Sequence, residues 1–114
     1  MQDILTCAMG LDIHRDVIVA CLAKGELGAD PEIEIRSFST LIPEMRKLRD
    51  WVLEAECHHV AMESTGIYWQ PIYEMLEPCF DGQISILVVN ARHMKNVPGR
   101  KTDMRDAQWI ATLL

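Results

Sequence analysis

The stretch that decides the fold is residues 5–22, LTCAMGLDIHRDVIVACL. Residues 5–13 carry few polar groups and predict a β-strand, and residues 17–22 are rich in β-branched side chains, which favour a second strand. Residues 14–16, His-Arg-Asp, form a short polar break between the two runs. The spacing predicts a β-hairpin, with Asp12 at the end of its first strand.

Outward from this hairpin, the chain continues as a meander. Residues 24–31 contain two glycines and a proline and predict a loop. Residues 32–38 alternate charged and apolar side chains, which is typical of a strand with one wet face. We expect this third strand to lie at the edge of the sheet.

Helices and strands alternate in the next part of the chain. Apolar residues recur at helical spacing up to residue 56, and Ser39 or Thr40 is predicted to cap that helix. Residues 59–62 predict a short strand that ends at Glu63, and residues 67–77 predict a second helix. Residues 84–89, apolar apart from one serine, predict a strand covered on both faces.

These elements predict one α/β domain. Three strands in meander, followed by right-handed β-α-β crossovers, give a mixed five-stranded sheet with strand order 3-2-1-4-5 and helices packed on its faces. A chain of 114 residues is large enough for a single compact core.

The last quarter of the chain, residues 89–114, combines basic and acidic residues ahead of an apolar run. The formal net charge of −6 argues against bulk non-specific binding of nucleic acid, but a local basic strip can contact a phosphate backbone. A solvated loop that is polar only for solubility is the alternative. The candidate nucleic-acid-binding residues in this strip are Arg92, Lys95, Arg100, Lys101 and Arg105.

Four acids are predicted to meet at one edge of the sheet. Asp12 and Glu63 end neighbouring parallel strands, at the carboxyl ends where open α/β sheets place their sites. Gly10 leaves room beside them. Asp103 and Asp106 lie about one turn apart at the start of the last predicted helix, which can lie over the same edge.

Converging carboxylates repel one another unless a cation binds between them. Oxygen ligands of this kind favour Mg²⁺ or Mn²⁺, and two such ions about 4 Å apart could flank a phosphodiester. Each acid also has a simpler interpretation, in which Asp12 caps the hairpin turn and Asp103 or Asp106 stabilises a helix start.

Neither zinc, disulfides nor a membrane span is indicated. The four cysteines, at positions 7, 21, 57 and 79, are widely spaced and contain no C-x-x-C pair. The apolar run at residues 84–89 is too short to span a bilayer, and no leader pattern opens the chain. We therefore expect a cytoplasmic protein that does not enter a membrane.

Four blocks of the sequence resemble a known family. They are GLDIH at residues 10–14, MESTGIYW at 62–69, VNAR at 89–92 and KTDMRDA at 101–107. Together they resemble the amino-terminal domain of DEDD transposases, bacterial insertion-sequence recombinases related to pilin-gene invertases. The catalytic domain of that family is similar to the RuvC Holliday-junction resolvase.

The resemblance implies an RNase H-like (RuvC-like) fold with Asp12, Glu63, Asp103 and Asp106 as a metal-binding catalytic tetrad. It also implies cleavage and exchange of DNA strands, guided in insertion-sequence members by a structured RNA encoded in the element. Family members carry a carboxy-terminal domain with a serine, which residues 1–114 lack, so we expect a domain that is incomplete on its own. Apolar residues at Leu113 and Leu114 suggest a homo-oligomer.

Two other interpretations stay open. Sugar-kinase and actin-like ATPases also begin with a strand ending in Gly-x-Asp, but the bulky turn at residues 14–16 and the lack of a later glycine-rich loop argue against them. A non-catalytic nucleic-acid-binding or assembly module could use Trp69, Tyr73 and Trp109 on a partner face. The simpler view places Trp69 and Trp109 in the core.

Overall fold

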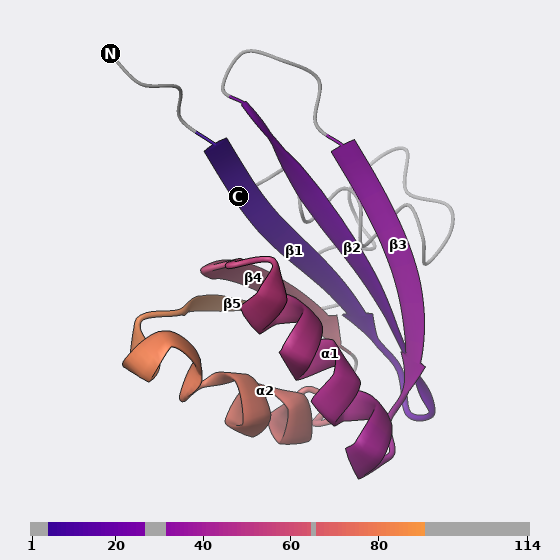
Figure 1. The fold of residues 1–114 in the computed structure, drawn as a ribbon. Helices are drawn as coiled ribbons and strands as arrows, with labels where there is room; N and C mark the ends of the chain where they lie inside the picture. The colour runs from indigo at the N-terminus through magenta and orange to yellow at the C-terminus, as the bar shows by residue number, and fades with distance from the viewer. Residues whose placement is uncertain (1–4, 27–31, 65, 91–114) are drawn as a thin grey trace.

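The chain forms a five-stranded mixed sheet with helices packed against it (Figure 1). The computed structural model describes residues 5–26, 32–64 and 66–90. In chain order the elements are β1 (Leu5–Ile13), β2 (Val17–Glu26), β3 (Glu32–Ser39), α1 (Ile42–Glu54), β4 (His59–Ser64), α2 (Gln70–Leu76), the short 3-10 segment η1 (Cys79–Gly82) and β5 (Ser85–Asn90).

The strand order is β3-β2-β1-β4-β5, which confirms the predicted topology. β1 pairs antiparallel with β2, and β2 with β3, as a meander requires. β4 then pairs parallel with β1, and β5 parallel with β4, through crossovers that contain α1 and α2. The hairpin turn closes where the backbone N–H of His14 donates to the carbonyl oxygen of Val17 at 2.9 Å.

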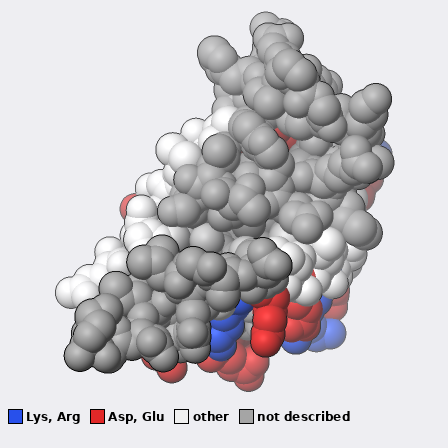
Figure 2. Space-filling view, turned by 90° about the horizontal axis from the view of Figure 1, so that it is seen from above, with Lys and Arg blue, Asp and Glu red and all other residues white. Residues whose placement is uncertain are grey.

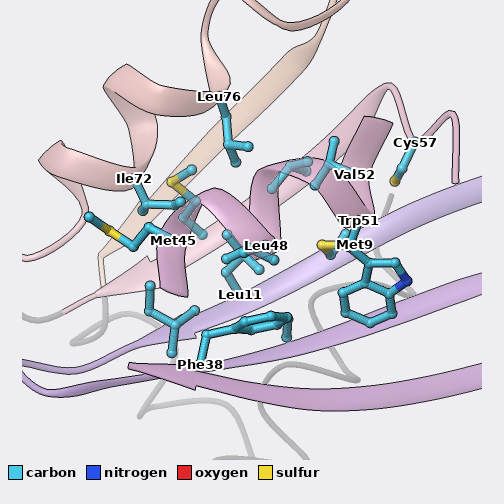
Figure 3. Packing of buried hydrophobic residues seen from close by; sticks show 14 of the residues in the cluster. Met9, Leu11, Phe38, Met45, Leu48, Trp51, Val52, Cys57, Ile72 and Leu76 are labelled. Carbon is cyan, nitrogen blue, oxygen red and sulfur yellow. The ribbon is translucent and has the colours of Figure 1, made fainter. Parts of the chain in front are cut away.

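Both described helices lie on the same face of the sheet (Figure 1). Alternate residues of β1 (Met9, Leu11 and Ile13) pack into a core with buried residues of α1 and α2. Figure 3 shows Leu48 of α1 and Ile72 of α2 directed into this core. Because side chains alternate along a strand, Gly10 and Asp12 belong to the opposite face.

The third strand matches its predicted place. β3 is the outer strand beside β2, and its exposure alternates along its length, as the charged and apolar pattern predicted. Arg36 of β3 reaches over α1, where its guanidinium lies 4.1 Å from the ring centroid of Trp51. The edge strand is therefore tied to the helix layer by a cation–π contact.

The cap of α1 differs from the prediction. Leu41, not Ser39 or Thr40, is the residue before the first helical turn, and no side chain caps the helix. The Ser39 hydroxyl oxygen accepts from the backbone N–H of Leu41 at 3.3 Å. The Thr40 hydroxyl donates to the carbonyl oxygen of Arg15 at 2.8 Å. Both hydroxyls thus hold the connecting loop instead of the helix end.

Two element boundaries and the burial of one strand also differ. β4 continues through Glu63 to Ser64, and α2 is shorter than predicted because residues 66–69 form a turn. β5 is not covered on both faces, since the Leu87 side chain is 50% exposed. Trp69 is partly buried against the core, as the simpler interpretation of this residue predicted. Its ring is edge-on to the ring of Tyr73, with 5.5 Å between the ring centroids.

Among the described residues, no helix is long and apolar enough to cross a membrane.

Candidate active site

The carboxyl ends of β1 and β4 bring two of the predicted site residues together. Asp12 and Glu63 are direct partners in the parallel pairing of these strands. Adjacent strands lie about 4.8 Å apart, so the two side chains are neighbours on one face. Each residue is only 3% exposed. A pair of buried acids therefore lies at one edge of the sheet.

The local sequence explains why both acids face away from the helices. Leu11 and Met62, which precede them, are fully buried in the helix-covered core. A strand alternates its side chains, so placing these two apolar residues in the core directs Asp12 and Glu63 to the other face. Core packing thus fixes the side on which the carboxylates lie.

The residues paired with the acids on the outer neighbouring strands are apolar. Val19 of β2 is paired with Asp12, and Val89 of β5 is paired with Glu63. One step back on the same face, Gly10 is paired with Ala61, which is fully buried. The valines lower the local polarity on either side, and Gly10 contributes no side chain to this face. Carboxylates in such surroundings favour a bound cation.

His14 is the residue that sequence reasoning assigned only to the turn. Its Nε2 lies 3.2 Å from Oδ1 of Asp12, and its side chain is 39% exposed. The sequence could have indicated this contact, because residues two positions apart in an extended chain lie on the same face, so His14 follows Asp12 on one face. His14 can therefore orient the Asp12 carboxylate from the solvent side.

The other predicted site residues lie outside the described residues. These are the acids Asp103 and Asp106 and the basic residues Arg92, Lys95, Arg100, Lys101 and Arg105. Within residues 5–26, 32–64 and 66–90, no three His, Cys, Asp or Glu side chains group closely enough to hold a metal ion. The described acids are a pair of hard oxygen ligands of the kind that Mg²⁺ and Mn²⁺ prefer. They fit such an ion as one side of a larger ligand set.

The cysteine- and histidine-rich segment at residues 57–59 is held by local contacts. The Cys57 thiol donates to the carbonyl oxygen of His59 at 3.3 Å, and burial raises the pKa of that thiol to about 12. The His58 ring stacks on Phe80 with 3.9 Å between ring centroids. A thiol that stays protonated is a poor metal ligand. These contacts favour a structural role for the segment.

The surface charges of the described residues are mixed. In Figure 2 basic and acidic side chains lie next to one another along one rim of the molecule. Among the described residues, several charged side chains form ion pairs: Arg15 with Asp16 at 3.0 Å, Lys47 with Glu44 at 2.9 Å, and Arg49 with Asp50 at 3.1 Å. Pairing of this kind lowers the net positive charge of the described surface.

Comparison with known proteins assigns the family. The model of the DEDD transposases of the IS110 type, described as "Transposase", matches residues 9–114. The chain belongs to this transposase family. The matched region includes the strand end that carries Asp12 and the edge that carries Glu63. A search of curated proteins finds no match.

Solved structures show the same fold at low sequence identity. The RuvC structure from Thermus thermophilus is 11% identical with a TM-score of 0.61, over 95% of this chain and 91% of that chain. The fowlpox virus resolvase, solved with Holliday junction DNA, is 9% identical with a TM-score of 0.64, over 93% and 96%. The transposase domain thus has the predicted RuvC-like, RNase H-like fold.

A third similar structure is a much longer protein. The Aquifex aeolicus member of the Ppx/GppA family is 10% identical with a TM-score of 0.50, over 79% of this chain. This chain spans only 37% of the length of that protein. At this identity the likeness concerns the fold alone.

Proposed function

We propose that this transposase domain cleaves and exchanges DNA strands at a metal site built on Asp12 and Glu63. The observation that carries the proposal is the direct pairing of two buried acids on parallel strands, in a chain that belongs to a transposase family. Asp103 and Asp106 are proposed to complete the ligand set. The ions would be Mg²⁺ or Mn²⁺.

Each described residue has a definite part in this proposal. Bound metal ions would activate the attacking oxygen and stabilise the leaving oxygen of a phosphodiester. Asp12 and Glu63 would bind the metal ions through their carboxylates. His14 orients Asp12 through the 3.2 Å contact between Nε2 and Oδ1. Val19 and Val89 flank the acids and keep water from their sides. The basic residues Arg92, Lys95, Arg100, Lys101 and Arg105 are proposed to hold the DNA backbone.

The wider assembly is also a proposal. The family resemblance supports a guide RNA as a second partner and a serine-containing carboxy-terminal domain as a further part of the reaction. The apolar residues Leu113 and Leu114 support a homo-oligomer as the working form. Residues 1–114 would then form the RuvC-like catalytic domain of that assembly. The four described cysteines are free thiols, which supports a cytoplasmic location for the protein.

Calorimetry with Mn²⁺ tests the metal site. We expect Asp12→Asn and Glu63→Gln each to abolish measurable binding, because each removes a charged oxygen ligand and keeps the side-chain shape. Asp106→Asn tests the proposed contribution of the last segment in the same way. Asp16→Asn is the matched control, since Asp16 lies in the same hairpin but its side chain is 76% exposed.

Unchanged Mn²⁺ affinity in both Asp12→Asn and Glu63→Gln would exclude this site. A positive result is followed by a cleavage assay with branched DNA, the substrate class of the fowlpox virus resolvase structure. Cleavage that requires Mn²⁺ and both acids supports the proposed reaction, whereas cleavage by Asp12→Asn contradicts it.

A further inference from the structure

A second site lies at the same end of the sheet, on the helix side. An open pocket of about 410 Å³ is formed where the β1–β2 turn meets the amino-terminal parts of α1 and α2. Its lining includes Arg15 from the turn, Tyr68 from the segment after β4, and Gln70 and Glu74 from α2. This volume is in the range of sites for small ligands.

The pocket adjoins the acid pair through the chain itself. Arg15 follows Asp12 by three residues, and Tyr68 follows Glu63 by five, so both come from the segments that leave the carboxyl ends of β1 and β4. Asp12 and Glu63 occupy one face of this sheet edge, and the pocket occupies the other side. A nucleic-acid strand whose phosphate lies at the acids could therefore place a neighbouring base in the pocket.

The apolar wall of the pocket is unusually exposed. Ile67 is 67% exposed and Tyr68 is 42% exposed, although both are large hydrophobic residues. An aliphatic side chain and an aromatic ring at the mouth of a small pocket provide flat surfaces on which a planar ring can stack. Stacking on aromatic side chains is how proteins commonly hold unstacked bases.

The polar wall provides donors and an acceptor of opposite charge. Arg15 donates to Asp16 through Nε and Nη2 and keeps its Nη1 hydrogens for a ligand. Gln70 offers an amide, and Glu74 offers a carboxylate. The Thr40 hydroxyl holds the carbonyl oxygen of Arg15 at 2.8 Å, which fixes the turn that carries the guanidinium. A carboxylate in the lining disfavours a phosphate inside the pocket and favours a group that donates hydrogen bonds.

We propose that this pocket binds one unstacked nucleobase that carries an exocyclic amino group, taken from the strand that lies at Asp12 and Glu63. The inference rests on the proposed function, because it needs nucleic acid at the acid pair. The base stacks on Tyr68, its amino group donates to Glu74, and Arg15 lies beside the adjoining phosphate. Adenine, cytosine and guanine carry such a group, whereas thymine does not.

The test measures binding of short single-stranded oligonucleotides to the full chain, in EDTA, by fluorescence anisotropy. We expect oligo-dC and oligo-dA to bind more tightly than oligo-dT. Tyr68→Ala should weaken binding of oligo-dC at least about fivefold, because stacking is lost. Tyr68→Phe keeps the ring and should bind within about twofold of the unmodified chain.

A second variant pair tests the amino-group contact. Glu74→Gln should reduce the preference for oligo-dC over oligo-dT, because an amide is a weaker acceptor than a carboxylate. Glu77→Gln is the matched control, since Glu77 is exposed just beyond the end of α2 and does not line the pocket. Fluorescence of 2-aminopurine within an oligonucleotide should be quenched by the unmodified chain and not by Tyr68→Ala.

The metal site and the nucleobase pocket can be tested independently of each other. Mn²⁺ affinity should be unchanged in Tyr68→Ala and Glu74→Gln, while loss of metal binding in Asp12→Asn should leave oligonucleotide binding in EDTA intact. Equal oligonucleotide binding by Tyr68→Ala and the unmodified chain would overturn the base pocket. So would light scattering in which Tyr68→Ala dissociates an oligomer without changing oligonucleotide affinity, because the exposed residues would then be a protein interface.

Discussion

Asp12 has an acid on one side and an imidazole on the other. Glu63 is its partner across the parallel strands, and His14 Nε2 lies 3.2 Å from its Oδ1. The side chain of Asp12 is 4% exposed and that of His14 is 39% exposed, so the imidazole is the more accessible of the two groups. An outer partner of this kind restricts how a carboxylate can turn toward a metal ion.

Replacement of this imidazole should weaken metal binding without removing a ligand. We expect His14→Ala to lower Mn²⁺ affinity about 10- to 100-fold, the range typical for loss of an outer-shell partner. Calorimetry measures the change. His59→Ala is the matched control because His59 is an exposed histidine at the opposite end of β4. Equal affinity in the His14 variant would mean that Asp12 is positioned without help from the imidazole.

Cys57 provides a pH-dependent contribution to stability. Burial, with a smaller effect of neighbouring Cys7, raises the pKa of the Cys57 thiol from its ordinary 9.0 to about 12. The folded state therefore disfavours the thiolate, and the associated stability is fully present below pH 9 and is lost as pH rises toward 12. The thiol should also react slowly with iodoacetamide in the folded protein.

The measurement compares the unmodified chain with Cys57→Ala, which has no thiol to ionise. The difference in free energy of unfolding between them should be constant below about pH 9 and should shrink as the pH is raised to about 10.5. Since lysine and tyrosine side chains titrate equally in both proteins, they cancel in this difference. A difference that stays constant through that range contradicts the raised pKa.

At the scale of single elements, α1 begins without a side-chain cap. Leu41 has the extended backbone of a capping residue, with φ −75° and ψ 148°, and is 69% exposed. Glu44 lies three positions later, so a serine at position 41 would create the S-x-x-E pattern of a capping box. We expect Leu41→Ser to stabilise the protein by about 0.5–2 kcal/mol.

Chemical denaturation with urea measures this change. Leu41→Ala is the control, because it removes the same exposed leucine without adding a cap. If both variants have the same free energy of unfolding, the hydroxyl does not reach the backbone N–H groups of the first turn.

The alternation of apolar residues was enough to predict most elements. Both ends of β1 and the beginnings of β2 and β3 matched, because period-two patterns and turn residues are local signals. The predicted cap of α1 was wrong because the Thr40 hydroxyl donates a hydrogen bond to the carbonyl oxygen of Arg15. Arg15 lies 25 residues earlier, so no local pattern reveals this contact. The apolar composition of β5 was misleading, since Leu87 is exposed in spite of it.

At the scale of the whole molecule, metal binding should be visible as thermal stability. Like charges held together in the fold oppose folding, and an ion that binds only the folded state opposes unfolding. At a free Mn²⁺ concentration about 100 times the dissociation constant, the expected stabilisation is about 2.7 kcal/mol, which is a rise in Tm of several degrees. Differential scanning calorimetry with and without Mn²⁺ measures it.

Glu63→Gln separates site binding from general ion effects. This variant should melt higher than the unmodified chain in EDTA, or at the same temperature, and should gain little from Mn²⁺. An equal rise in Tm for both proteins would show that the ion acts elsewhere on this acidic chain.

The acid pair could be predicted from the sequence, and the base pocket could not. Asp12 and Glu63 each follow an apolar strand, and the topology alone makes those strands parallel neighbours. The pocket needs Arg15, Tyr68 and Glu74 to meet, which depends on how a turn packs against two helices. Such contacts between separate elements carry no periodic signal in the sequence.

The alternation in β4 ties the placement of Glu63 to fold integrity in a way that affects how the gene can diverge. Met62 and Glu63 occupy opposite faces of the same strand, so an in-frame insertion or deletion of one codon upstream within β4 would exchange them. A charge would then enter the core, and a thioether side chain would take the place of the Glu63 carboxylate. Variants with such a change should be lost as insoluble protein before they could persist as folded but inactive copies. Point substitution is thus the route by which inactive yet well-folded relatives would arise.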